Sequence, residues 1–314
     1  MKRNKISVIG AGNVGSAVAF HLMISKIASD IVLYDIDNKK ALGEALDIYQ
    51  GTSLLAPVNV YAGTLEDTKN SDIVVITAGA NQKVGETRLD LVNKNIQIYQ
   101  TLIKDIVKYN PNAILLVVSN PVDILTYITY KISGFPKSRV IGSGTVLDTS
   151  RFKAALARRF NLDSRNIHGY VIGEHGDSEI AVFSNLHIGG ITIDEFLKLK
   201  HIEDINFKED IASEIKNAAY EIISRKGYTN YAVAVAVTKI CTAILRDERS
   251  IMTVSSFLDG QYGVSDVYLS TPTIVGREGI LEILELTLSH QEQMRFRKSA
   301  DVIKNIIKES NLWI

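Results

Sequence analysis

A glycine cluster near the N-terminus has the spacing of a phosphate-binding turn. Gly10, Gly12 and Gly15 lie in the segment GAGNVG, where an apolar run ends and a helical pattern begins. Glycine allows a tight turn and a close backbone approach to a pyrophosphate, whose negative charge is attracted by the N–H groups of a helix start. An ordinary tight turn explains this spacing equally well. Asp35, twenty positions beyond Gly15, suits hydrogen bonds to an adenosine ribose and would repel the extra phosphate of NADP. The pattern therefore predicts NAD as the cofactor. We expect Val14, which lies in the same turn, to contact it together with the three glycines and Asp35.

Four further polar segments follow apolar runs or open helical patterns. Their sequences are GANQKVGETR at 79–88, SNPVD at 119–123, LDTSRF at 147–152 and GEHGD at 173–177. The first, bounded by glycines, suits a flap over the carboxyl edge of a sheet, although a plain surface loop is the alternative. Asp148 and Arg151, three residues apart, share one face of a helix, so a carboxylate and a bidentate anion clamp can point into one cavity. Considered singly, each is as easily a surface ion pair or a capped helix start.

The elements that must position these segments follow from the hydrophobic pattern. Short Val- and Ile-rich runs alternate with segments of helical period, as in βαβ units around a parallel sheet. We expect strands at 5–9, 31–34, 58–61, 73–77, 114–118 and 140–141, with helices at 13–24, 39–55, 87–109 and 122–131. Beyond about Gly142 we expect helices at 145–160 and 204–225, and strands at 169–172, 180–183, 253–258, 267–275 and 281–286. The sequence thus predicts an α/β fold, in which a doubly wound parallel sheet (Rossmann fold) at 1–142 precedes a mixed α/β second domain at 143–314.

The composition narrows the classes of partner. Thirty-five Lys and Arg residues balance 35 Asp and Glu residues over 314 positions, which argues against a nucleic-acid binder or a polybasic membrane protein. No uninterrupted apolar run reaches the roughly 18 residues of a membrane span. The single cysteine, Cys241, cannot form an intrachain disulfide and points to a reducing compartment, so we expect a cytoplasmic location.

The order of the motifs carries a resemblance. The series GAGNVG, LYDID, GANQKVGETR, SNPVD, LDTSRF, GEHGD and KGYTNYA runs across nearly the whole chain. It resembles the lactate/malate dehydrogenase family, and its lactate branch in particular. The resemblance implies an NAD-binding domain, then a mixed α/β substrate domain, and the reversible reduction of pyruvate to L-lactate by NADH.

The resemblance also implies roles for individual residues. His175 matches the proton donor and acceptor, a task that suits imidazole because both of its forms exist near neutral pH. Asp148 matches the carboxylate that fixes the tautomer of this histidine. Arg151 matches the clamp on the substrate carboxylate, and Arg88 matches the group that polarises the ketone.

Further contacts are carried over from the same motifs. Asn120 and Thr229 match contacts in the substrate pocket. The cofactor contacts implied beyond the glycine turn and Asp35 are Lys40, Gly79, Ala80, Asn120 and Val233.

Gln82 bears on the choice of substrate. Where the malate branch carries an arginine that pairs with the second carboxylate of oxaloacetate, this chain has an uncharged glutamine. A dicarboxylate would leave a buried charge unpaired, so the resemblance favours pyruvate. Larger 2-oxo acids with branched side chains and malate stay open as alternatives. A second alternative is a non-catalytic NAD-binding redox sensor, although sensing does not require Arg88, Asp148, Arg151 and His175 together.

Regulation and assembly are further implications of the resemblance. Lys153 and His168 occupy the positions through which many bacterial members bind the activator fructose 1,6-bisphosphate, but lysine replaces the usual arginine and loses its bidentate grip on phosphate. An ordinary solvated helix residue is the alternative for Lys153. The family is typically a homotetramer. We expect no metal site, because the other histidines lack ligand partners at suitable spacing.

Overall fold

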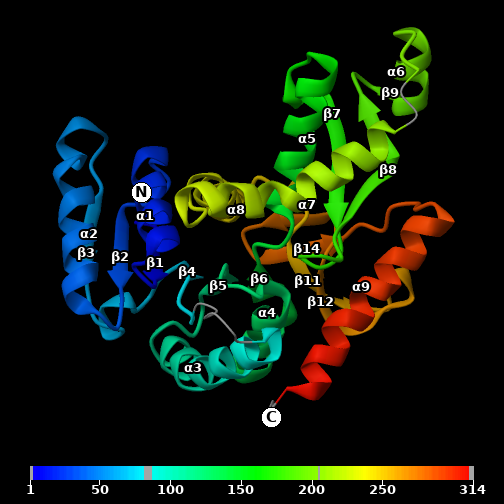
Figure 1. Cartoon of the computed structure of the whole chain (residues 1–314). Coiled ribbons are helices and arrows are strands. Elements are labelled where there is room, and N and C mark those ends of the chain that lie inside the picture. Colours follow the sequence, from blue (N-terminus) through cyan, green and yellow to red (C-terminus); the bar gives the residue numbers. More distant parts are fainter. Residues whose placement is uncertain (1–2, 81–86, 204–205, 311–314) are drawn as a thin grey trace.

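The structure is a computed structural model that describes residues 3–80, 87–203 and 206–310 (Figure 1). Its centre is an eight-stranded sheet with the strand order β12-β11-β6-β5-β4-β1-β2-β3. The strands from β1 to β6 are parallel and lie at Lys5–Ile9, Asp30–Tyr34, Asn59–Ala62, Ile73–Ile76, Ile114–Val117 and Val140–Gly142. This arrangement confirms the predicted doubly wound sheet.

The central strands are apolar on both faces because helices cover both faces. Every residue of β4 (IVVI) and of β5 (ILLV) is buried, as expected for parallel strands inside a sheet. Ile73 and Val75 belong to one core, whereas Val74 and Ile76 belong to the other. The first core contains residues of α1 (Asn13–Ser25), α2 (Asn38–Gln50) and α8 (Tyr231–Arg246), and the second contains residues of α3 (Arg88–Tyr109), α4 (Val122–Ser133) and α9 (His290–Glu309). Figure 1 shows α8 beside α1, so the second half of the chain helps to cover the first sheet.

The second half adds two small sheets and completes the large one. One small sheet has the order β7-β8-β9, and the other has the order β10-β13-β14. β11 and β12 form an antiparallel hairpin, and β11 pairs with β6 at the edge of the large sheet. The bounds in this half are α5 Val146–Phe160, β7 Ile167–Ile172, β8 Ile180–Ile188, β9 Ile191–Thr192, α6 Ile193–Leu199, α7 Phe207–Lys226, β10 Ser250–Met252, β11 Ser255–Asp259, β12 Ser265–Ser270, β13 Thr273–Gly276 and β14 Gly279–Ile283.

Some predicted boundaries were wrong. The single strand predicted at 267–275 is two strands, β12 and β13, which belong to different sheets. Pro272 separates them, and proline cannot donate a hydrogen bond to a ladder. The helix predicted at 39–55 ends at Gln50 and is followed by a short 3-10 turn at Thr52–Leu54. The sequence analysis did not anticipate β10 or α9.

No helix in the described part of the chain is both long enough and apolar enough to cross a membrane.

Candidate active site

The glycine turn joins β1 to α1, and its three glycines have different surroundings. A Cβ on Gly10 would lie 2.8 Å from the Ala78 backbone nitrogen, and one on Gly15 would lie 1.8 Å from the Gly10 carbonyl oxygen. Gly10 also has φ of +103°, a conformation that favours glycine. A Cβ on Gly12, in contrast, would meet no atom of the described residues within 4 Å. Packing therefore requires Gly10 and Gly15, whereas Gly12 keeps open a space beside the chain.

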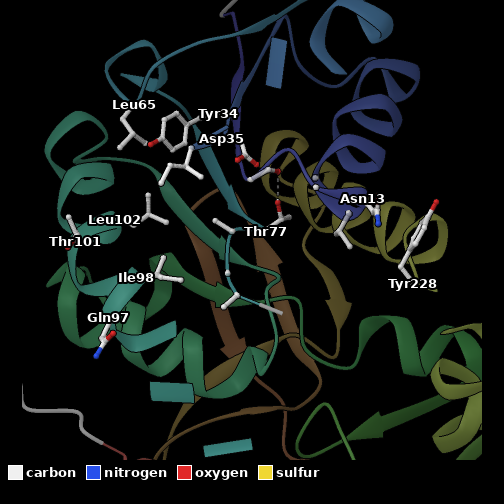
Figure 2. Close-up of a pocket in the computed structure, with 18 of the residues that line it drawn as sticks. Asn13, Tyr34, Asp35, Leu65, Thr77, Gln97, Ile98, Thr101, Leu102 and Tyr228 are labelled. Carbon is white, nitrogen blue, oxygen red and sulfur yellow. Dashed lines mark hydrogen bonds between the residues drawn. The ribbon is translucent and has the colours of Figure 1, made fainter. Parts of the chain in front are cut away.

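That open space belongs to a cavity of about 930 Å³ at the carboxyl edge of the sheet. Figure 2 shows Asn13 and Tyr228 on one side of this cofactor cavity and Leu65, Ile98 and Leu102 on the other. Among the residues that the structure describes, no side chain caps the start of α1, so the first backbone N–H groups of the helix can bind an anion. A cavity of this size, with a glycine turn, an uncapped helix start and several apolar side chains in its wall, suits a dinucleotide.

Asp35 lies where the cofactor cavity meets the glycine turn. It follows the last residue of β2, and its carboxylate accepts hydrogen bonds from the Ala11 and Asp37 backbone N–H groups at 2.6 and 2.9 Å. Asp35 also lines the cavity, as Figure 2 shows. The Asp35 carboxylate therefore braces the glycine turn and also borders the cavity.

The structure distributes the sequence-predicted cofactor residues unevenly. Those in the wall of the cofactor cavity are Gly10, Gly12, Val14, Gly15, Asp35, Gly79 and Ala80, together with the predicted substrate contact Thr229. Lys40 is exposed in the first turn of α2, where its backbone N–H donates to Asp37. Asn120 is exposed after β5, and Val233 packs against the core beside the turn.

Two of the predicted catalytic residues, Asp148 and His175, and the predicted substrate clamp Arg151 meet at one buried carboxylate. Asp148, in the first turn of α5, lies 2.5 Å from His175 Nδ1 through Oδ2, and its Oδ1 accepts a hydrogen bond from Arg151 Nη1 at 2.7 Å. The side chain of Asp148 is 2% exposed, whereas those of Arg151 and His175 are 16% and 24% exposed. An imidazole and a guanidinium therefore flank a single buried charge, and both remain accessible.

These three groups also set the protonation of the cluster. Burial by itself would lower the pKa of His175, but the charge and hydrogen bond of Asp148 outweigh it and raise this pKa to about 9. Burial opposes ionisation of Asp148, yet the neighbouring His175 and Arg151 charges hold the pKa of its carboxyl below the ordinary value. At neutral pH the cluster thus contains an imidazolium, a carboxylate and a guanidinium.

Asp123 holds the loop between β7 and β8, which carries His175, against the large sheet. This residue is buried in the first turn of α4 and accepts hydrogen bonds from the His175 backbone N–H at 2.8 Å and from Ser255 Oγ at 2.5 Å. Residues from α4, β11 and the loop after β7 are therefore joined at one side chain. Asp123 belongs to the SNPVD motif, but no role was predicted for it; the available signal was an acidic residue in the first turn of a mostly apolar helix.

Sheet topology brings the cluster near the cofactor cavity. β4, β5 and β6 are neighbours, and the segments after them carry Ala80, Asn120 and Asp148 respectively. Since adjacent strands are about 4.8 Å apart, the ends of β4 and β6 are separated by roughly 10 Å. Asn95 of α3 holds the segment that follows β4 and lines the cavity, because its Oδ1 accepts a hydrogen bond from the Ala80 backbone N–H group at 2.7 Å.

Other predicted residues lie apart or outside the described region. Gln82 and the side chain of Arg88 are outside the described residues, although Arg88 begins α3. Lys153 is partly buried on α5, and burial lowers the pKa of its ammonium group. His168 is exposed on β7, the strand that packs beside α5.

Comparison with known proteins matches both halves of the chain. Residues 4–142 match the family described as lactate/malate dehydrogenase, NAD binding domain, and residues 145–312 match its alpha/beta C-terminal domain. An L-lactate dehydrogenase of Clostridium perfringens is 56% identical over 99% of this chain and 98% of its own length. L-lactate dehydrogenase 1 of Clostridium acetobutylicum is 56% identical over 97% and 98%, respectively. The crystal structure of the minor L-lactate dehydrogenase from Enterococcus mundtii, in a ligands-bound form, has a TM-score of 0.96 and 40% identity over 99% of both chains.

Proposed function

The chain belongs to the lactate/malate dehydrogenase family of NAD-dependent oxidoreductases, and on this premise we propose that it reduces pyruvate reversibly to L-lactate with NADH. The observation that carries the proposal is the buried Asp148 carboxylate with His175 on one oxygen and Arg151 on the other. A 2-oxo acid offers one ketone to be protonated and one carboxylate to be clamped. The cluster provides a group for each.

The proton step follows from the geometry of His175. Asp148 engages Nδ1, which leaves Nε2 as the ring atom that donates a proton to the ketone oxygen and recovers it in the reverse direction. NADH, when bound in the cofactor cavity, would supply the hydride that adds to the carbonyl carbon. With the His175 pKa raised to about 9, the imidazolium form needed for reduction predominates at neutral pH.

Arg151 and the surrounding residues orient the substrate in this proposal. One guanidinium N–H group is held by Asp148, and the planar group fits a carboxylate through two parallel hydrogen bonds. By the family resemblance, Arg88 polarises the ketone as charge grows on its oxygen, while Asn120 and Thr229 contact the substrate. Gln82 provides no charge for a second carboxylate, which favours a monocarboxylate.

A panel of 2-oxo acids tests substrate and reaction together. We expect kcat/KM for pyruvate to exceed that for oxaloacetate and branched 2-oxo acids by about 100-fold, measured as loss of NADH absorbance. Replacement of Gln82 by arginine should raise oxaloacetate turnover strongly, because it adds a partner for the second carboxylate. Preference for a branched or dicarboxylic acid would reassign the substrate, and NADH binding without turnover of any acid would favour a redox sensor.

We also propose activation by fructose 1,6-bisphosphate through Lys153 and His168. Their adjacent elements, α5 and β7, support the proposal, as does the cationic character of lysine. The sugar bisphosphate should lower the KM for pyruvate at neutral or slightly raised pH, and Lys153→Ala should abolish this change. An unchanged saturation curve would exclude the activator site.

A homotetramer is the proposed assembly. Apolar side chains exposed on three neighbouring helices support self-association; they are Phe20 and Ile24 of α1, Leu42, Leu46 and Tyr49 of α2, and Tyr231 and Val235 of α8. Light scattering should give four times the chain mass, and Leu46→Lys should shift the protein to smaller species.

The buried, unpaired Cys241 supports the proposed cytoplasmic location.

A further inference from the structure

A third ionisable side chain lies at the Asp148–His175 pair. Glu179 follows His175 by four residues, at the start of the chain's return into β8. One carboxyl oxygen of Glu179, one ring nitrogen of His175 and one carboxyl oxygen of Asp148 lie within 4.8 Å of one another. No role for Glu179 was predicted from the sequence, and neither the proton step nor the substrate clamp described above requires a second carboxyl at this place.

The surroundings of Glu179 contain charges from several elements. Asp148 and Arg151 face it from α5, His175 faces it from its own loop, and Lys216 faces it from α7. Glu179 also lines a second cavity, of about 560 Å³, together with Arg295 and Lys298 of α9.

These surroundings disfavour the ionised form of Glu179. Within the described ranges, no group donates a hydrogen bond to its carboxyl, so an ionised Glu179 would be poorly solvated. Burial and, next, the negative charge of Asp148 raise the pKa of Glu179 to about 8, although His175, Arg151 and Lys216 oppose this rise. The carboxyl is consequently neutral at pH 7 and loses its proton only slightly above this pH.

We propose that Glu179 is a positioning residue that couples substrate binding to a second proton: its neutral carboxyl permits the anionic 2-oxo acid to bind, and its ionisation disfavours binding. The inference rests on the proposed function, because it assumes a carboxylate held by Arg151. An ionised Glu179 would place a second negative charge beside Asp148. The single positive charge of Arg151 would then face two carboxylates of the protein, and its attraction for the substrate carboxylate would be weaker. Binding would require protons on both His175 and Glu179.

The number of protons can be counted with oxamate, the amide analogue of pyruvate. Its Kd for the NADH-loaded protein is measured by calorimetry from pH 6 to pH 10. If two protons are needed, log Kd rises with pH with a slope that approaches two above pH 9. In Glu179→Gln, which stays neutral, the slope should approach one, and oxamate should bind about tenfold more tightly than to the unmodified protein at pH 9. Below pH 7 the two proteins should bind it about equally.

Asp177→Asn is the matched control. Asp177 lies in the same loop but is exposed, with Tyr220 donating to its carboxylate at 3.3 Å. Its removal should leave the slope near two. Equal slopes in the unmodified protein and Glu179→Gln, or an equal change in Asp177→Asn, would overturn the inference.

Infrared spectroscopy supplies a readout independent of binding. The unmodified protein at pH 7 should show the carbonyl band of a protonated carboxyl that Glu179→Gln lacks, and NADH affinity should show that the variant is folded. Absence of this band would overturn the inference about Glu179 and leave the proposed function unaffected. Failure of every variant to bind oxamate, together with no turnover of pyruvate, would overturn the proposed function and this inference with it.

Discussion

At the glycine turn the wall of the cofactor cavity is backbone, whereas the catalytic cluster consists of ionisable side chains from α5 and from the loop after β7. Gly12 contributes an open space within six consecutive residues. Asp148, Arg151 and His175 contribute charges that depend on one another, with Asp123 holding the loop in place. The difference indicates that cofactor affinity and proton transfer can be altered separately.

The largest expected effect lies in the catalytic cluster. His175→Ala should reduce kcat/KM for pyruvate about 1,000-fold, because the variant lacks the imidazole Nε2 that protonates the ketone oxygen in the proposed mechanism. NADH affinity, measured by fluorescence titration, should stay within about twofold. The exposed His290 provides the control, since His290→Ala should retain full activity. A parallel loss of NADH affinity in His175→Ala would break the separation between the two regions.

Asp148→Asn should sharpen the electrostatic half of the comparison. Without the carboxylate charge, burial dominates and the pKa of His175 should fall from about 9 towards or below 6.5. At pH 8 the reduction of pyruvate should then be about 30-fold slower, with a smaller difference at pH 6. A pH profile that keeps its original midpoint would contradict the role of Asp148.

The same pair has a consequence for stability. The pKa of His175 is raised in the folded state, so its pairing stabilises the protein fully below pH 6.5 and progressively less as pH rises through about 9. Thermal unfolding of Asp148→Asn should therefore depend less on pH across this window.

Two glycines of one turn give the next largest effect. Gly12→Ala should leave the melting temperature unchanged, since φ is −75° and no atom in the described part of the chain lies within 4 Å of the added Cβ, but should weaken NADH binding about tenfold. Gly15→Ala should destabilise the fold itself, because its Cβ would overlap the Gly10 carbonyl oxygen. Calorimetry of both variants separates the two outcomes. An equal loss of stability in Gly12→Ala would mean that packing, and not the cofactor, requires the glycine.

The smallest expected effect concerns Asp35. Asp35→Asn preserves an oxygen for the Ala11 N–H group but removes the charge that would repel the extra phosphate of NADP. NADH affinity should fall about threefold and NADPH affinity should rise. Titration with both cofactors checks this, and an unchanged ratio of their Kd values would exclude a role in discrimination.

The comparison also explains what the sequence could predict. The glycine turn and Asp35 are local features, so strand, turn and acidic residue could be read from short spacings. The buried strands were predicted for the same reason, because runs such as IVVI need no knowledge of their neighbours.

Long-range features were harder to predict. Nothing in the residues of β11 and β12 shows that their partner is β6, which lies more than a hundred positions earlier. α9 has only a narrow apolar face, with Phe296, Ala300 and Ile303 buried along a largely charged helix. Asp123 and Glu179 escaped notice because a buried carboxyl and an exposed one have the same letter in the sequence.

The hairpin of β11 and β12 constrains how the protein can be made. The parallel sheet begins at residue 5, but its β6 edge receives its last two strands only when residue 270 has been synthesised. Until then the edge of β6 that faces away from β5 lacks its neighbour β11 in a nascent chain. Such an unpaired edge is a surface on which other chains can aggregate. The N-terminal half should consequently be a poor candidate for independent expression, and a ribosome that stalls before this hairpin would release a protein dependent on chaperones.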